Sequence, residues 1–346
     1  MVAEIQTTAG ILLFFLITAI LWLPAQYILF NKSFMGIFGR RKDLRGKHVF
    51  ITGGSKGIGF AIAQAFLRKG CRVSIIARSI KDLDNAKKIL MEDSPGRVSR
   101  YSADTTRSDQ LSKAVAAAEQ DMGPIDILVC NAGISIPKLC TQTKIEEYEK
   151  QVDVNYMGTV RTTKLVLPGM LERQSGHILF VSSVMGVLGF AGYSSYAPTK
   201  WAIRGFADCL HNELQGTGVS VSIAYPPDTD TPGFAIENEV KADLCKTVNA
   251  ALGSHTFTSD MVGNTIVDKF QKGQYHLTPP DLGASMLIST MTGLTPKVFW
   301  FPITMLLAPI LALVSSIFGM IGNRAARKCN MEYGYPLPSS SSSSSS

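Results

Sequence analysis

Hydrophobic and polar positions follow two alternating rhythms through the middle of this 346-residue chain. Short runs rich in β-branched and aliphatic residues predict buried strands at 48–52, 72–77, 125–130, 177–181 and 219–225. Between them, apolar residues recur at helical spacing, which predicts helices at 58–69, 108–122, 156–173 and 202–215. Strands that alternate with helices build a parallel sheet with helices on both faces. The expected fold class is therefore α/β, a doubly wound parallel sheet, over residues 43–281.

Residues 10–30 form the first of two apolar stretches outside this domain. They contain no charged side chain, are about long enough to cross a bilayer, and are followed by basic residues. Because basic flanks favour the cytosolic side, we expect residues 1–42 to be a transmembrane anchor with a cytosolic juxtamembrane segment. A cleaved signal peptide is the alternative, but Glu4 replaces the usual cationic start and no convincing small-residue cleavage site follows.

The second apolar stretch covers residues 282–330 and predicts a membrane-associated region. Its run 298–321 is of spanning length, but Pro302 and Pro309 interrupt it. A single crossing would also leave the basic residues that follow on the lumenal side. We therefore expect a re-entrant or surface-lying hairpin, and a hydrophobic lid or dimer helix is the alternative. Residues 331–346, which end in eight serines, are predicted to be disordered.

Charge and cysteine usage narrow the range of partners. The formal net charge is +7, but the basic residues gather beside the apolar stretches instead of forming a stripe along one element. This placement favours contact with lipid headgroups, and no nucleic-acid partner is expected. The six cysteines are scattered without metal-ligand spacing, so free thiols and no metal site are expected. The sequence leaves the oligomeric state open, with a homodimer as one option.

A glycine-rich loop follows the first predicted strand. That strand runs directly into Gly53-Gly-Ser-Lys-Gly57-Ile-Gly59, where a predicted helix begins. Glycine lets the backbone turn tightly, and the free N–H groups at a helix N-terminus attract the negative charge of a phosphate. The loop therefore predicts a dinucleotide site at the carboxyl ends of the strands.

Four further motifs follow this loop in a fixed order. Asn131-Ala-Gly133 comes directly after a predicted strand, and Asn155 accompanies a helical pattern. Ser182-Ser183 ends the next strand, and Tyr196-Ala-Pro-Thr-Lys200 begins thirteen residues after the second serine. Together with the G-x-x-x-G-x-G loop, these motifs resemble those of the short-chain dehydrogenase/reductase family. The resemblance implies a Rossmann-type fold and reduction of a carbonyl with a nicotinamide cofactor.

The catalytic roles follow from what the reduction of a ketone requires. Tyr196 and Lys200 are four residues apart, so on a helix they share one face. A phenol can give its proton to the carbonyl oxygen if a nearby ammonium stabilises the phenolate that remains. Ser183 would donate a hydrogen bond to the same oxygen, although a shift of one residue would give this role to Ser182. The resemblance implies that Asn155 holds a water in a proton relay.

Cofactor choice is expected at the end of the strand 72–77. No acidic residue stands there to hold a ribose hydroxyl, whereas Arg78 can pair with a 2′-phosphate and Lys56 adds a second cation. The sequence therefore predicts NADPH, and an ordinary solvated arginine is the alternative. Asp104 resembles the family position beside the adenine ring.

The segment after the strand 219–225 narrows the substrate. It reads Ala224-Tyr-Pro-Pro-Asp-Thr-Asp-Thr-Pro-Gly-Phe234, where the family usually has Pro-Gly-x-x-x-Thr over the nicotinamide. With both apolar flanks, this run resembles the family members that reduce 3-ketodihydrosphingosine to dihydrosphingosine at the cytosolic face of the endoplasmic reticulum membrane. A membrane-anchored steroid or retinoid reductase is the alternative. The implied cofactor-binding residues are Gly53, Ser55, Lys56, Gly57, Ile58, Gly59, Arg78, Asp104, Asn131, Ala132, Gly133, Tyr196, Lys200, Pro226, Thr229 and Thr231.

That lipid substrate carries an amine beside its ketone, which a steroid or a retinoid lacks. Asp228 and Asp230 follow the last predicted strand, so one of their carboxylates is a candidate partner for the ammonium group. The alternative is structural, because Asp230 or Thr231 could cap a helix that begins at Pro232.

Overall fold

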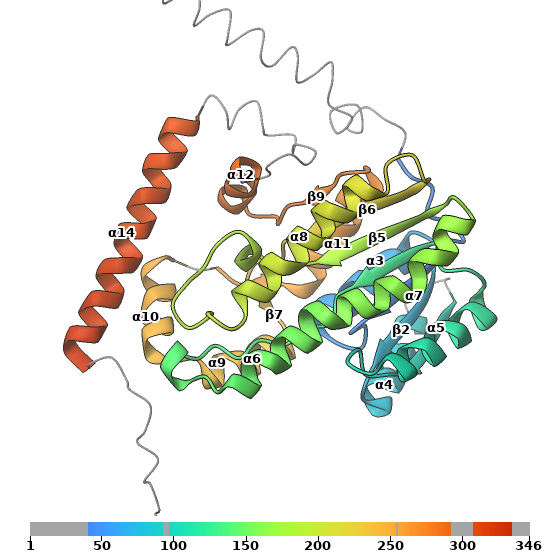
Figure 1. The fold of residues 1–346 in the computed structure, drawn as a ribbon, viewed down its shortest axis with the longest axis horizontal. Coiled ribbons are helices and arrows are strands. Elements are labelled where there is room, and N and C mark those ends of the chain that lie inside the picture. Colours follow the sequence, from blue (N-terminus) through green and yellow to red (C-terminus); the bar gives the residue numbers. More distant parts are fainter. Residues whose placement is uncertain (1–40, 93–96, 254, 292–306, 334–346) are drawn as a thin grey trace, which may run out of the picture.

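A seven-stranded parallel sheet forms the centre of the molecule (Figure 1). The computed structural model describes residues 41–92, 97–253, 255–291 and 307–333. The strands of the sheet are β1 His48–Thr52, β2 Arg72–Ala77, β3 Val98–Ser102, β4 Ile127–Cys130, β5 Gly176–Val181, β6 Val219–Ala224 and β9 His276–Leu277. They lie in the order β3-β2-β1-β4-β5-β6-β9. The order reverses between β1 and β4, where α/β proteins open a crevice for ligands. The predicted doubly wound parallel sheet is confirmed.

Helices cover both faces of this sheet. One layer consists of α3 Gly57–Arg68, α4 Ile80–Glu92 and α11 Ser259–Gln271, and the other of α5 Ser108–Met122, α7 Gly158–Glu172 and α8 Ala197–Glu213. Val49 and Ile51 of β1 pack into the first layer, and Phe50 packs into the second. Because both faces are covered, the central strands are apolar throughout, which made them recognisable in the sequence.

One helical run passes the carboxyl edge of the sheet. It consists of α6 Ile145–Gln151, the π-helical turn η2 Val152–Met157 and α7. The sequence predicted a helix only from residue 156, so the run begins eleven residues earlier than expected. Two short 3₁₀ turns, η1 Cys140–Gln142 and η3 Val184–Gly186, lie in the loops after β4 and β5.

A small unit lies between β6 and α11. It consists of β7 Thr229–Asp230, α9 Pro232–Val240, α10 Asp243–Ala251 and β8 Phe257–Thr258. β7 and β8 pair in parallel as a separate two-stranded sheet. Strands of two residues carry no periodic signal, so the sequence did not predict this sheet.

The C-terminal part consists of α12 Leu282–Thr290 and α14 Ala308–Tyr333, and α14 lies alongside α10, away from the sheet (Figure 1). Leu244 and Val248 of α10 pack with Cys329 of α14. α14 is continuous over its whole length and ends at Tyr333, three residues into the predicted tail, whose other residues lie outside the described ranges.

Nothing in the described part of the chain tests the predicted membrane anchor. Residues 10–30, in which it was predicted, lie outside the described ranges. Among the residues that are described, no helix combines the length and the apolar character needed to cross a bilayer. The transmembrane anchor therefore stays a prediction.

Close packing of α11 on α3 depends on Gly263. A Cβ at this position would lie 2.7 Å from the backbone carbonyl carbon of Ala61 and 2.8 Å from its Cβ. We predict that Gly263→Ala lowers the free energy of unfolding by about 1–3 kcal/mol, because the two helices must move apart. Gly205→Ala is the matched control, since a Cβ there meets nothing within 4 Å. Thermal unfolding should show loss of stability in the first variant only, and equal melting temperatures would contradict the prediction.

Candidate active site

The glycine-rich loop closes around the amino end of α3. Gly53 has a φ of 66°, which side chains with a Cβ rarely adopt, and a Cβ at Gly59 would clash with Gly53 and Asn131. The N-cap residue Lys56 makes no side-chain capping hydrogen bond, so the first-turn N–H groups lack that partner. This end of α3 therefore fits a phosphate. The remaining predicted residues of the loop and first turn are half-buried: Ser55, Gly57 and Ile58.

Asn131 ties the glycine-rich loop to the end of β4. Its side-chain amide donates to the carbonyl oxygens of Thr52 and Gly53, at 3.1 Å each. In return, the Thr52 hydroxyl accepts hydrogen bonds from the backbone N–H groups of Asn131 at 2.9 Å and Ala132 at 3.0 Å. These four bonds fix the loop on the neighbouring strand, so Asn131 shapes the cofactor site through the backbone.

Asn155 lies fully buried in the π-helical turn η2. Its side chain accepts a hydrogen bond from the Ile134 N–H at 2.8 Å, and donates to the Ile134 carbonyl and the Thr199 hydroxyl, both at 2.9 Å. It thereby joins the segment after β4 to α8. Gly133 lies beside it, and a Cβ there would come within 3.4 Å of the Lys200 Nζ. π-Turns often occur at functional sites.

The two serines after β5 point in different directions. Ser182 is buried and its hydroxyl donates to the Lys200 carbonyl at 2.9 Å. Ser183 accepts a hydrogen bond from the Met185 N–H at 3.1 Å, and its side chain is within hydrogen-bonding reach of Tyr196. Ser183 is therefore the serine that shares the site with Tyr196.

Tyr196 and Lys200 stand at the start of α8. Tyr196 is its N-cap residue, and Pro198 occupies the second helical position, where a missing N–H costs little. The Lys200 ammonium donates to the Val181 carbonyl at 3.2 Å and lies 5.5 Å from the centre of the Tyr196 ring. Lys200 is 4% exposed, so its charge is almost fully removed from water.

Burial sets the protonation of this pair. It lowers the pKa of Lys200 from 10.5 to about 8. Burial raises the pKa of Tyr196, and the negative charges of Glu237 and Asp228 raise it further, while the hydrogen bond with Ser183 opposes them. Tyr196 is therefore protonated at neutral pH, as a proton donor to a carbonyl oxygen must be.

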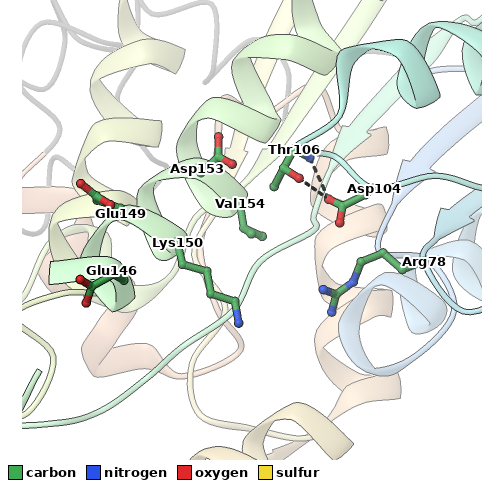
Figure 2. A pocket seen from close by; sticks show the side chains of 8 residues that line it. All are labelled: Arg78, Asp104, Thr106, Glu146, Glu149, Lys150, Asp153 and Val154. Carbon is green, nitrogen blue, oxygen red and sulfur yellow. Dashed lines mark hydrogen bonds between the residues drawn. The ribbon is translucent and has the colours of Figure 1, made fainter. Parts of the chain in front are cut away.

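A cleft of about 460 Å³ lies between the ends of β2 and β3 and the helix α6. Figure 2 shows Arg78 and Lys150 extending toward each other across it. Asp104 lines the same cleft, and its carboxylate accepts hydrogen bonds from the N–H and hydroxyl of Thr106 at 2.9 and 2.8 Å. Glu146, Glu149 and Asp153 also line the cleft, so a phosphate group would fit only where the two cations converge.

The sequence analysis proposed two cations for this phosphate site, Arg78 and Lys56, and they differ in whether a carboxylate already pairs with them. In the described part of the chain the Arg78 guanidinium makes no ion pair. Lys56 forms an ion pair with Asp82 at 2.7 Å, so it would have to leave that carboxylate to reach a phosphate. Lys150 was not predicted, because the lysine is far from the phosphate motifs in sequence and only the path of α6 brings it to the cleft.

The segment after β6 lies against the glycine-rich loop, since a Cβ at Gly57 would be 3.0 Å from the Thr231 Cγ2. Pro226 and Thr229 are buried. The Thr231 hydroxyl caps α9 by accepting a hydrogen bond from the Phe234 N–H at 3.0 Å. The sequence left the capping of this helix open between Asp230 and Thr231, and the structure shows that Thr231 is the cap.

The two aspartates of this segment differ in their surroundings. Asp230 is exposed, whereas Asp228 is partly buried and burial raises its pKa. A carboxylate that faces water has little selectivity for a ligand, because water competes for it. Asp228 is therefore the better placed of the two to meet a substrate.

Sequence reasoning missed a charged group beside Tyr196. Glu237 accepts a hydrogen bond from the Tyr193 hydroxyl at 2.6 Å and lies 3.6 Å from the Lys241 ammonium. The rings of Tyr193 and Tyr196 are 6.1 Å apart. The only available signal was the spacing of Glu237 and Lys241, one helical turn apart, which ordinary exposed helices also show.

Comparison with known proteins agrees with this geometry. Residues 47–241 match the short chain dehydrogenase family. The chain is 35% identical over 291 residues to the 3-ketodihydrosphingosine reductase of Dictyostelium discoideum, covering 79% of this chain and 86% of that relative. It is 35% identical over 262 residues to the 3-dehydrosphinganine reductase of Danio rerio, covering 72% and 79%. The protein therefore belongs to the short-chain dehydrogenase family.

Solved structures show the same fold. Levodione reductase is 24% identical with a TM-score of 0.63, and the similarity covers 69% of this chain and 97% of that one. A metagenomic short-chain oxidoreductase solved in complex with NADP is 27% identical with a TM-score of 0.51, covering 54% and 84%.

Tyr196 should be needed for turnover but not for cofactor binding. We predict that Tyr196→Phe lowers kcat by at least about 100-fold, because the ketone loses its proton donor, while the Kd for NADPH changes by less than about threefold. Steady-state kinetics and fluorescence titration with NADPH measure the two effects. Lys200→Met should impair both, and a Tyr196→Phe enzyme with most of its activity would refute the assignment.

The protonation of Lys200 should appear in the pH profile. Its ammonium form is present below a pKa of about 8 and is lost above it, so kcat/KM should fall as the pH rises through about 8. A ketone without an amine should be used, so that the substrate itself does not titrate. In Lys200→Arg the charge persists, and the residual activity should lack this decline. If kcat/KM of Lys200→Arg fell over the same pH range, the decline would come from a titratable group other than Lys200.

Proposed function

We propose that this protein reduces the ketone of 3-ketodihydrosphingosine to the alcohol of dihydrosphingosine with NADPH, a step of sphingolipid synthesis. The observation that carries the proposal is the convergence of Ser183, Tyr196 and Lys200 at the carboxyl edge of the sheet. Relatives named 3-ketodihydrosphingosine reductase and 3-dehydrosphinganine reductase align over 79% and 72% of this chain and over 86% and 79% of their own length. A steroid or retinoid reductase would use the same three residues, so the substrate distinguishes the two functions.

Each residue has a defined part in the reduction. Bound NADPH supplies the hydride for the carbonyl carbon. The Tyr196 hydroxyl gives its proton to the carbonyl oxygen, and the Lys200 ammonium stabilises the phenolate that results. Ser183 donates a hydrogen bond to the same oxygen while negative charge develops on it. Asn155 holds the segment after β4 against α8, which keeps this geometry fixed.

NADPH is the proposed cofactor because the end of β2 is cationic. Arg78 follows β2 with no acidic residue directly after the strand, and Lys150 approaches from the other side of the cleft (Figure 2). A guanidinium and an ammonium both favour the 2′-phosphate of NADPH over the neutral hydroxyl of NADH. The structural relative that was solved with NADP is consistent with this choice.

The proposed location is the endoplasmic reticulum membrane, with the catalytic domain in the cytosol. Two features support it: the uncharged run 10–30 and the large apolar side chains exposed along the first half of α14, among them Ile310, Leu313 and Ile317. A lipid substrate is dissolved in the bilayer, so an enzyme bound there meets it at high local concentration. The region 282–330 is proposed to lie on the membrane and pass the lipid to the site.

The experiment that tests the function is a comparison of substrates. Purified full-length protein is incubated with NADPH and, in separate reactions, with 3-ketodihydrosphingosine, a keto-steroid or retinal, and the alcohol product of each reaction is measured by mass spectrometry. Turnover of the sphingoid ketone with little turnover of the others is the expected result. Preference for the steroid or retinal would support the alternative, and cofactor binding without any turnover would refute an enzymatic role.

Cofactor preference should depend on Arg78. We predict that Arg78→Asp weakens NADPH binding by at least about 1.5–3 kcal/mol, the contribution of a charge-assisted hydrogen bond, and narrows or reverses the preference over NADH. The ratio of kcat/KM values for NADPH and NADH is the measurement. Lys113→Asp, a surface change on α5 that does not line the cleft, is the control. Equal use of both cofactors by the unmodified enzyme would contradict the proposal.

A further inference from the structure

The position of Tyr196 determines which side chains lie near a bound ketone. Because its hydroxyl must reach the carbonyl oxygen, groups around Tyr196 also surround the atoms next to that carbonyl. The Lys200 ammonium lies 5.5 Å from the centre of the Tyr196 ring, and the negative charges that act on Tyr196 are those of Glu237 and Asp228. Glu237 is bonded to Tyr193, whose ring lies 6.1 Å from that of Tyr196. The surroundings of the reacting carbonyl are therefore negatively charged on the side of α9.

Glu237 is held in place beside Tyr196 by two contacts. Its carboxylate accepts the Tyr193 hydroxyl at 2.6 Å and lies 3.6 Å from the Lys241 ammonium. The side chains of Glu237 and Lys241 are only 14% and 5% exposed. Glutamate and lysine are rarely buried to this extent unless they are paired, and a pair in such surroundings is sensitive to the arrival of a further charge.

The charges of this region do not balance. Lys241 is the cation that acts on Asp228, and Glu237 is the other charged group that does so. Within the described residues, no hydrogen bond or ion pair involves the Asp228 carboxylate. When both acids are ionised, two carboxylates share one ammonium, which leaves one negative charge without a partner. A cationic ligand would complete the pairing.

A substrate with an amine on the carbon next to its ketone would bring that cation. Once the ketone lies at Tyr196, the geometry of the molecule confines the ammonium to the immediate neighbourhood of the carbonyl. We propose that Glu237, together with Asp228, binds this ammonium and makes the enzyme selective for α-amino ketones. This inference rests on the proposed function and extends it by naming Glu237 as a residue that determines specificity.

A purely structural role for Glu237 makes a different prediction. If its bond with Tyr193 only fastened α9 to the loop before α8, any weakening of that bond would affect all ketones alike. Glu237→Gln separates the two roles, because glutamine still offers an oxygen to the Tyr193 hydroxyl but carries no charge. Loss of charge should therefore affect only the substrate that has an ammonium group.

The test measures kcat/KM with NADPH for 3-ketodihydrosphingosine and for the same long-chain ketone without its amine. In the unmodified full-length enzyme we expect a preference for the amino ketone. Glu237→Gln should lower the ratio of the two kcat/KM values by at least about tenfold, the effect of one lost charge-assisted hydrogen bond. Asp228→Asn should lower the ratio in the same direction.

Glu239→Gln is the matched control, since Glu239 is exposed on the same helix and the change removes the same charge. It should leave the ratio within about twofold of the unmodified enzyme, so that the general field of α9 is excluded as the cause. An unchanged ratio in Glu237→Gln, or an equal loss on both ketones, would overturn the inference. So would an unmodified enzyme that reduces both ketones equally well, although the proposed function would stand. Failure of the unmodified enzyme to reduce the amino ketone would refute the proposed function itself.

Discussion

Burial of the Lys200 ammonium is unfavourable in itself, and the active site is arranged around this charge. An ammonium that leaves water loses its hydration, which is why its pKa falls to about 8. The Val181 carbonyl and the face of the Tyr196 ring compensate for part of that loss. Gly133 leaves room beside the Nζ, because a Cβ would come within 3.4 Å of it. Asn155 braces the same segment from η2. A change at any of these points would therefore reach the ammonium, and through it the proton donor.

The carboxyl edge of the sheet brings together groups that are distant in sequence. Strands β1 and β4 end at the glycine-rich loop and at Asn131, and the hydrogen bonds of Thr52 lock the two ends together. Strand β5 ends at two serines that point in opposite directions because the side chains of an extended chain alternate. Ser182 therefore anchors α8 through the Lys200 carbonyl, and Ser183 lies on the side of Tyr196.

Charge around the reacting carbonyl has two consequences. Burial raises the pKa of Tyr196, and the carboxylates of Glu237 and Asp228 raise it further, which keeps its proton in place. The same carboxylates would attract an ammonium next to the carbonyl, and an ammonium bound there would offset their effect on the tyrosine. The electrostatic field of these two carboxylates would then affect both the selectivity for an amino ketone and the release of the proton from Tyr196. A steroid or a retinoid brings no charge that could take part in this balance.

The sequence by itself predicted five strands of the seven-stranded sheet, the glycine-rich loop and the helical spacing that puts Tyr196 and Lys200 on one face. Buried parallel strands are apolar on both faces, and residues four apart on a helix lie on the same face. Both patterns can therefore be recognised in a short stretch of sequence. The bounds of β1 and β2 were predicted to the residue. Short strands such as β7 and the early start of the helical run at α6 gave no local signal.

Only the tertiary structure decided which of several chemically similar groups take part. It assigned the site to Ser183 over Ser182, partnered Lys56 with Asp82, and brought Lys150 to the cleft. It also placed Glu237 beside Tyr196, although the two lie on different elements. Residue type and spacing reveal what chemistry a side chain can perform, but the partners of a charge depend on how distant elements pack, and no local pattern encodes that.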